Sequence, residues 1–282
     1  MPRLIVNADD FGLTAGVNRA ILELHSAGLL TSATLMARAQ ASEEAIEMAR
    51  ATPTLGVGCH VVLVDGRPAL PADRIRSLTQ RGSPHFFSSL SALLPRLTLG
   101  RIRPAQIEAE TRAQIEFLLN KGVRLTHIDT HKHTHMFPGI LRPVLRAARA
   151  CGIRAVRNPF EPAWAMRATP RAAWLRTIQV GLLRTLEPAC LRIIAEEGFS
   201  TTGGTVAVVG TGKLDTETLR SLLRQLPDGA DTAWELVTHP GYNDADLDRV
   251  RTRLRESRDI ERQALRALKE FPAIQLISFG DL

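Results

Sequence analysis

Short runs of apolar residues alternate with longer stretches of helical periodicity along the chain. The short runs predict β-strands, because each is brief and is followed by polar or turn-forming residues; they cover residues 4–8, 32–37, 57–63, 125–130, 155–157, 206–209, 236–238 and 274–279. Between them, the spacing of apolar positions predicts helices over residues 16–26, 42–51, 105–120, 140–150, 214–226 and 247–270. Strands that alternate with helices in this way indicate an α/β fold, namely a distorted (β/α) TIM-like barrel with parallel strands.

The chain has 282 residues with no break in composition and no internal repeat, so we expect a single barrel domain over residues 1–282. Two stretches, residues 65–99 and 160–197, are long for simple connections between a strand and a helix. Expanded loops of this kind shape the entrance to the active site at the carboxyl ends of barrel strands.

The composition favours a cytoplasmic location. No apolar run approaches the roughly 20 residues needed to cross a bilayer, and the first residues lack the apolar region and cleavage site of an export signal. Cys59, Cys151 and Cys190 have no metal-binding spacing and are odd in number. Buried reduced thiols are therefore expected, as in a reducing compartment.

The net charge of +7 does not by itself indicate a nucleic-acid partner, because basic and acidic residues are interleaved. Residues 244–270, for example, hold eight basic and seven acidic residues, which is typical of a solvated helix face. Residues 164–192 differ, with five Arg and one acid, Glu187, among apolar side chains. Such a segment can lie on an anionic membrane, or it can be a barrel helix with an Arg-rich solvent face. A homodimer also stays open.

Two adjacent carboxylates, Asp9 and Asp10, follow the first predicted strand in the run NADDFG. Carboxylates beside an apolar strand are costly unless they are paired or bind a cation. Since adjacent side chains of an extended segment point in opposite directions, one can face a metal while the other transfers protons. The alternative is a turn in which one of them caps the following helix.

A histidine cluster in residues 126–135 is the strongest chemical signal. It places His127, Asp129, His131, His133 and His135 on alternate positions. Period-two spacing directs the first three to one face of a strand, and the last two continue into the loop beyond. Imidazoles and a carboxylate together predict a divalent metal site. Since an open site takes about three protein ligands, the remaining side chains are expected to contact substrate or support the ligands.

Three more polar residues, His60, Arg157 and His239, lie in or at the end of apolar runs in other parts of the chain. Singly, each could be an ordinary core or strand-end residue. Taken with Asp9, Asp10 and the histidine cluster, they come from five segments that reach the same end of a parallel barrel. Active sites gather at that end, so the pattern predicts an enzyme. We expect Arg157 to keep Asp9 charged and oriented.

The runs NADDFG, GxH, HxDxHxHxH and HPG together resemble the YdjC-like carbohydrate deacetylases, also called the ChbG/HpnK family, over the chain from residue 3. The resemblance implies a distorted barrel that removes acetyl groups from N-acetylated amino sugars, either chito-oligosaccharides or GlcNAc-linked lipids. Where the family commonly reads GLHLNL or GMHFVL, this chain reads GCHVVL, a change that retains His60.

The resemblance also implies roles for individual residues. By motif position, Asp10, His60 and His131 would hold one divalent cation, Asp9 would be the general base and His239 the general acid. Two imidazoles and a carboxylate suit Zn²⁺, whereas the family is often described with Mg²⁺, so both metals stay open.

Two other classes share some of these features. Metal-dependent amidohydrolases and PHP-like phosphoesterases use similar barrels, but they place an HxH pair where this chain has Asp9 and Asp10. A non-catalytic sugar-binding barrel would be expected to have lost the base or the acid, whereas Asp9 and His239 are both present.

Overall fold

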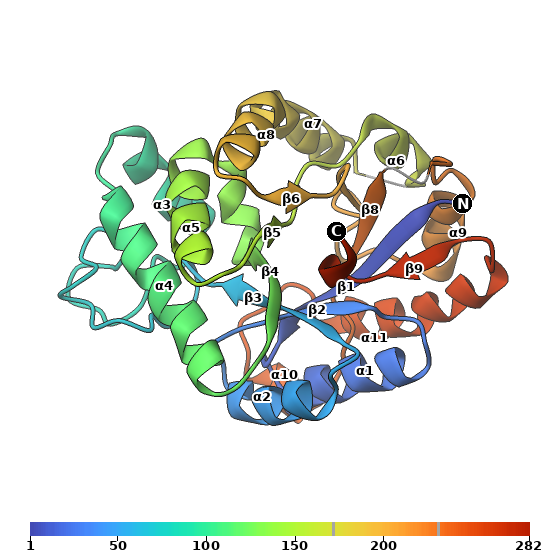
Figure 1. Cartoon of the computed structure of the whole chain (residues 1–282), viewed down its shortest axis with the longest axis horizontal. Helices are drawn as coiled ribbons and strands as arrows, with labels where there is room; N and C mark the ends of the chain where they lie inside the picture. Colours follow the sequence, from blue (N-terminus) through green and yellow to red (C-terminus); the bar gives the residue numbers. More distant parts are fainter. Residues whose placement is uncertain (171–172, 230–231) are drawn as a thin grey trace.

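The computed structural model of the chain describes residues 1–170, 173–229 and 232–282. Within them, nine parallel strands form one curled sheet in the order β6-β5-β4-β3-β2-β1-β8-β7, and β9 pairs with the first half of β1 (Figure 1). The strands are β1 Arg3–Phe11, β2 Ser32–Leu35, β3 Gly56–Val61, β4 Leu125–Thr130, β5 Ala155–Val156, β6 Ser200–Thr201, β7 Thr205–Val206, β8 Ala233–Thr238 and β9 Gln275–Ile277. The prediction of a distorted parallel barrel is confirmed.

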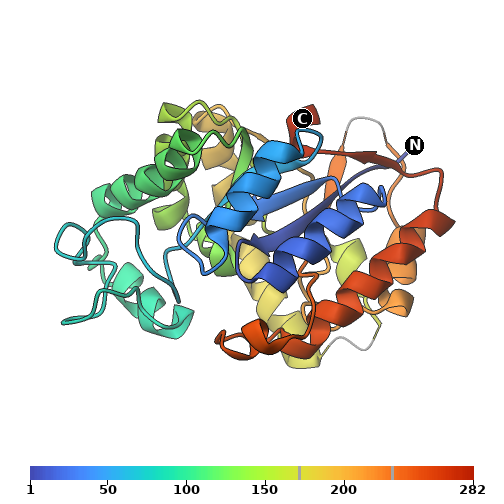
Figure 2. The same cartoon turned by 90° about the horizontal axis from the view of Figure 1, so that it is seen from below.

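Helices surround this sheet, as Figure 2 shows for α1, α2 and α11. The α-helices are α1 Ala15–Ser26, α2 Ser42–Ala51, α3 Leu90–Thr98, α4 Pro104–Asn120, α5 Pro138–Ala150, α6 Ala163–Ala168, α7 Trp174–Leu183, α8 Glu187–Glu196, α9 Thr216–Arg224, α10 Ala245–Asp248 and α11 Arg255–Ala264. Short 3-10 helices are η1 His131–Met136, η2 Arg184–Leu186, η3 Leu265–Glu270 and η4 Phe279–Asp281. Among the described residues, no helix is both long enough and apolar enough to span a bilayer.

Apolar side chains cover both faces of the sheet, inside the barrel and beneath the surrounding helices. In β1 every residue after Arg3 is buried, as expected of a parallel strand that is covered on both sides. A buried polar set interrupts this core: Asn7, Asp9 and Asp10 all lie on the same strand. The cost of burying them requires partners, and these partners form the site described below.

The predicted elements differ from the observed ones where local polarity hides the pattern. The helix expected over residues 247–270 is divided into α10, α11 and η3. Asp244 caps α10, since its Oδ1 accepts from Leu247 N (3.1 Å), and Arg255 Nη2 donates to Asp248 O (3.0 Å) at the other end. Strand β6 was not predicted, because its two residues carry no apolar signal. The expanded segments contain helices, namely α3 in residues 65–99 and α6 to α8 in residues 160–197.

Candidate active site

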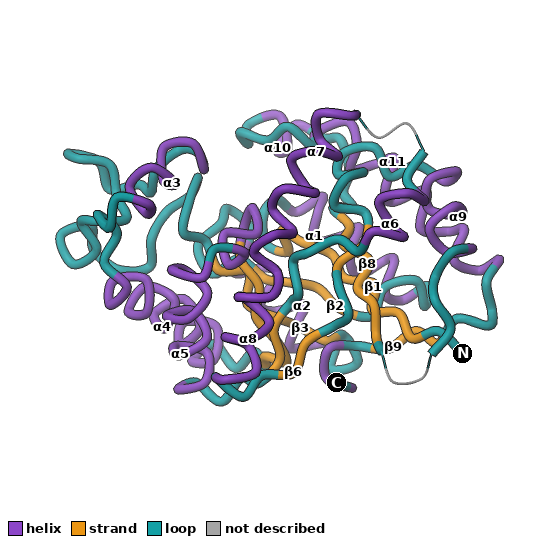
Figure 3. Tube along the Cα trace, turned by 90° about the horizontal axis from the view of Figure 1, so that it is seen from above, coloured by secondary structure: helices purple, strands orange, loops and turns teal. Residues whose placement is uncertain are grey.

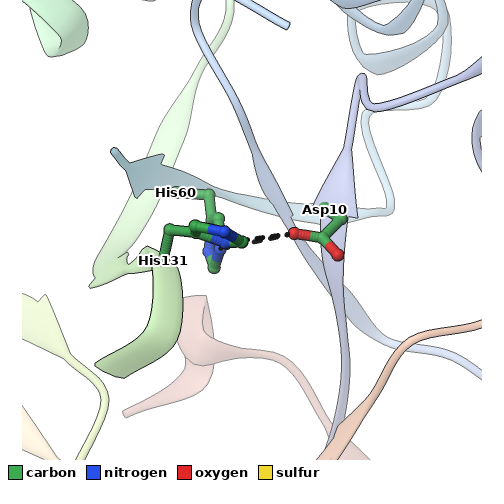
Figure 4. Close-up of side chains that lie close together, drawn as sticks. All are labelled: Asp10, His60 and His131. Atoms are coloured by element: carbon green, nitrogen blue, oxygen red, sulfur yellow. Dashed lines mark hydrogen bonds and ion pairs between the residues drawn. The ribbon is translucent and has the colours of Figure 1, made fainter. Parts of the chain in front are cut away.

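Three side chains from three different segments meet at the carboxyl ends of the strands (Figure 4). Asp10 is the next-to-last residue of β1, His60 lies on β3, and His131 begins η1 directly after β4. His60 Nε2 and His131 Nδ1 are 3.2 Å apart, and Asp10 Oδ1 lies 3.6 Å from the first nitrogen and 3.5 Å from the second. One carboxylate oxygen and two imidazole nitrogens therefore face a common point.

The backbone of β1 bends at this place. The register between β1 and β2 shifts between Ala8 and Phe11, and Asp10 adopts a left-handed conformation with φ 65°. Aspartate tolerates this conformation better than most residues, and bulges commonly redirect side chains near active sites. As a result Asp9 and Asp10 are both buried and both contact polar groups of the site.

His60 is oriented by Asp129, which pairs with it across β3 and β4. The Nδ1–H of His60 donates to Asp129 Oδ1 at 2.8 Å, which leaves Nε2 for the point shared with Asp10 and His131. Burial lowers the pKa of His60, but the carboxylates of Asp129, Asp9 and Asp10 together raise it to about 9. A histidine whose second nitrogen binds a carboxylate is the usual arrangement for a metal-ligating imidazole.

The donor set fits a divalent cation. Two imidazole nitrogens and one carboxylate oxygen match the ligands of catalytic zinc sites, which leave a further position for water. A second group, Asp9, His60 and Asp129, is similarly close, but Arg157 already binds both of its carboxylates. The group of Asp10, His60 and His131 therefore suits the cation better.

Asp9 belongs to a buried network around Arg157, whose guanidinium is fully enclosed. Nη1 and Nη2 of Arg157 donate to the two oxygens of Asp9 at 2.9 and 2.6 Å, and Nη1 lies 2.5 Å from Asp129 Oδ2. Nε and Nη2 also donate to Glu235 Oε1 at 2.8 and 2.6 Å. Burial raises the pKa of Asp9, but Arg157, together with His60 and His239, holds this pKa well below its usual range. Asp9 is therefore an ionised carboxylate.

His239 follows β8 and approaches Asp9 from the other side. Its Nε2 lies 3.8 Å from Asp9 Oδ2, and its side chain is 12% exposed. Its backbone N donates to Glu261 Oε2 at 2.6 Å, and its Nδ1 is 3.7 Å from the same oxygen. Burial lowers the pKa of His239. The carboxylates of Glu261, Asp9 and Asp10 raise it by more, so that the net shift is upward. An imidazole with a raised pKa beside a carboxylate with a lowered pKa is an arrangement suited to acid–base chemistry.

Comparison with known proteins identifies the family of the chain. The family model described as YdjC-like protein matches residues 3–271. The chain belongs to the YdjC-like family. A carbohydrate deacetylase of Brevibacillus brevis is 34% identical over 99% of both chains, and one of Oceanobacillus iheyensis is 29% identical over 87% of this chain and 88% of its own. A crystal structure from Enterococcus faecalis, provisionally described as a cellobiose-phosphate cleavage protein, superposes with a TM-score of 0.76 at 25% identity, covering 99% of this chain and 98% of the other.

His127 lies deeper in this YdjC-like barrel than the other histidines of the cluster. It pairs with Gly58, whereas Asp129 pairs with His60 two residues further along β3. Its ring stacks on Phe279 with centroids 3.9 Å apart, and burial lowers its pKa to about 3. Only glycine fits opposite it, because a Cβ at Gly58 would lie 2.5 Å from His127 Nε2. The face expected from period-two spacing is present, but His127 packs against the carboxyl-terminal η4.

His135 supports the backbone of Arg157. Its Nδ1 accepts from Thr130 Oγ1 at 2.7 Å and its Nε2–H donates to the carbonyl of Arg157 at 3.2 Å. Burial lowers the pKa of His135 to about 4, so the ring is neutral, as these two bonds require. His135 therefore contributes to the position of Arg157 rather than to the point shared by the metal-binding group.

His133 faces a cleft beside the site. Lys132 and His133 both adopt a left-handed backbone conformation, which turns η1 away from the direction of β4. The cleft is lined by His133 and Met136 together with Phe160, Glu161, Val180 and Leu183. His133 is thus a histidine of the cluster that lines this cleft.

Three functional side chains were not singled out from the sequence: Glu235, Arg258 and Glu261. Arg258 Nη2 donates to Asp10 Oδ2 at 2.5 Å, so that the two oxygens of Asp10 have separate partners. Burial raises the pKa of Glu235 to about 7 despite Arg157. The expectation of a solvated face for residues 244–270 is wrong for Arg258 and Glu261, which are both about 1% exposed. A charged residue inside an apolar strand, as at Glu235, was the available signal.

Proposed function

We propose that this chain is a metal-dependent hydrolase that removes the N-acetyl group of an N-acetylated amino sugar and releases acetate and the free amine. The observation that carries the proposal is the meeting of Asp10, His60 and His131 beside the pair formed by Asp9 and His239. The naming of the YdjC-like relatives as carbohydrate deacetylases supports the substrate class.

The residues present match what amide hydrolysis requires. An amide carbonyl is a poor electrophile, and its nitrogen leaves only when it is protonated. A cation held by Asp10, His60 and His131 would polarise the carbonyl and lower the pKa of a nearby water. The remaining tasks, which are to accept a proton from the water and to give one to the nitrogen, belong to residues of the chain itself.

Asp9 and His239 would carry these two proton transfers. As the water oxygen bonds to the carbonyl carbon, Asp9 accepts a proton from that water; Arg157 keeps Asp9 ionised and fixes both of its oxygens. As the carbon–nitrogen bond breaks, His239 gives its proton to the departing amine nitrogen. The neighbouring carboxylates, Glu261 and Asp9, favour the protonated form of His239 that this step needs.

Acetate release before and after chelation tests the proposal. The wild-type protein should release acetate from N-acetylglucosamine, N,N′-diacetylchitobiose or a GlcNAc-linked lipid, lose this activity with a chelator, and recover it with Zn²⁺ or Mg²⁺ added singly. The preferred substrate would distinguish sugar from lipid. Metal binding measured by calorimetry without acetate release from any substrate would contradict the deacetylase, and phosphomonoesters would then be assayed.

We also propose that the face of α7 binds an anionic membrane surface and leaves the protein cytoplasmic but peripherally attached. Trp174, Leu175, Ile178 and Leu182 share one side of α7, and their exposed fractions run from 51% to 69%. Figure 3 places α7 on the side of the molecule opposite the two termini. The charge of the segment suits an anionic surface: Arg167 and Arg192 are exposed nearby, whereas Arg171 lies outside the described residues.

Vesicle flotation checks this contact. We expect the wild type to float with phosphatidylglycerol-containing vesicles at low salt and not with pure phosphatidylcholine. The Trp174→Ser/Ile178→Ser double variant should not float, because apolar insertion is lost. Ile260→Ser, at an exposed apolar residue of α11, is the matched control. Failure of the wild type to float, or conversion of a dimer to a monomer by the α7 variant, would contradict the membrane contact.

A further inference from the structure

Helix α11 buries a charged face against the site. Ser257, Arg258, Glu261 and Ala264 are its buried residues, whereas an ordinary surface helix buries an apolar stripe. Burial of a charged side chain is costly unless it has a specific partner. The partners of Arg258 and Glu261 therefore show what this face does.

Arg258 and Glu261 are three positions apart on one helix, yet the structure shows no ion pair between them. Arg258 uses its guanidinium on Asp10, while Glu261 uses its carboxylate on His239. Within the described residues, Arg258 Nε and Nη1 and Glu261 Oε1 have no hydrogen-bond partner. If Arg258 and Glu261 served only to stabilise the helix, they would pair with each other. Because they bind Asp10 and His239 instead, their role concerns the site.

The loop that carries His239 depends on α11 for its position. It leaves β8 through Pro240 and Gly241, beyond the last paired residues of the sheet. Two hydrogen bonds attach it to α11: His239 N donates to Glu261 Oε2 at 2.6 Å, and Gly241 N donates to the carbonyl of Arg258 at 3.2 Å. The space there is narrow, because a Cβ at Gly241 would lie 3.1 Å from Arg258 Cδ.

We propose that Glu261 is the positioning residue of His239: it fixes the loop through the backbone N–H and holds the imidazole with its Nε2 toward Asp9. Glu261 acts through His239 and does not touch substrate. The role of His239 as proton donor rests on the proposed function, whereas the position and protonation of His239 do not. Three carboxylates face this imidazole, namely Glu261 from α11 and Asp9 and Asp10 from β1.

The Glu261→Gln variant separates positioning from simple packing. The amide oxygen of Gln can still accept from His239 N, but the negative charge beside Nδ1 is lost. Since that charge favours the imidazolium form, its removal should lower the pKa of His239, and the protonated form should be lost at lower pH. We expect kcat to fall roughly tenfold to a hundredfold, by analogy with carboxylates that orient other functional histidines. The alkaline limb of the pH profile should move to lower pH.

NMR titration of the His239 ring in the holoprotein and metal-free protein measures the same effect without catalysis. Glu256→Gln makes the identical change at an exposed residue of α11 and should leave the His239 pKa and kcat unchanged. Glu261→Asp is the second test in case Glu261→Gln does not fold. It retains the charge and should therefore keep the His239 pKa closer to the wild-type value. An unchanged His239 pKa in folded Glu261→Gln would overturn the positioning role. Absence of acetate release by the wild type would instead overturn the proposed function.

Discussion

Replacement of Asp9 by Asn is expected to lower kcat for acetate release by about 10²- to 10⁴-fold, the usual contribution of a general base. The amide has nearly the same shape but cannot accept a proton from water. Because Asp10, His60 and His131 are unchanged, KM and metal affinity should change much less than kcat. Steady-state kinetics and metal titration by calorimetry on the same preparations measure the three quantities.

The matched control is Asp246→Asn, since the side chain of Asp246 is 42% exposed and pairs with exposed Arg249 at 3.5 Å. It should retain wild-type kinetics. Thermal unfolding of both variants shows whether the Asp9 amide has disturbed the buried network. If folded Asp9→Asn kept most of its activity, the base would lie elsewhere, and Asp129 would be the next carboxylate to replace, because it shares Arg157 with Asp9.

The sequence could predict the meeting of Asp10, His60 and His131 because parallel strands carry their end residues to one rim. Asp10 and His60 are also unexpected polar residues beside apolar runs, and His131 belongs to the histidine cluster, so each is visible without its partner. Period-two spacing predicted one strand face for His127, Asp129 and His131, but β4 ends at Thr130 and His131 begins η1. The spacing also does not give the depth of His127 and Asp129 in the barrel. Depth depends on register, and β3 pairs Gly58 with His127 and His60 with Asp129.

Arg258 and Glu261 could not be found in this way. They lie among charged residues whose spacing is that of a solvated helix, and their partners, Asp10 and His239, are distant in the chain. The break between α10 and α11 was hidden for a similar reason, since it depends on side-chain caps rather than on Gly or Pro. The burial of these charges depends on tertiary contacts between helices and the sheet, and local sequence propensity does not predict such contacts.

Replacement of Arg157 by Met is expected to destabilise the fold by about 3–5 kcal/mol at neutral pH, because it leaves buried carboxylates without their cation. Asp9, Asp129 and Glu235 all bind this one guanidinium, and none of them is exposed to solvent that could replace it. Urea unfolding gives the free energy directly. Arg249→Met, at a side chain that is 73% exposed, should change stability little.

The pH dependence of this loss distinguishes charge from packing. In the wild type, Arg157 lowers the pKa values of Asp9 and Asp129, so their stabilising contribution is present above the usual carboxyl pKa and is lost only as pH falls through the lower folded values. Glu235 has the opposite effect on stability, because burial raises its pKa to about 7 from 4.5. The free energy of unfolding therefore declines as pH rises through that interval. Without Arg157 all three carboxyls would retain protons in the folded state, so the variant should lose stability continuously as pH rises. The difference from wild type should therefore be smallest in mild acid and largest above neutrality. A difference that stays constant with pH would mean that Arg157 stabilises the barrel by filling space rather than by balancing the three carboxylates.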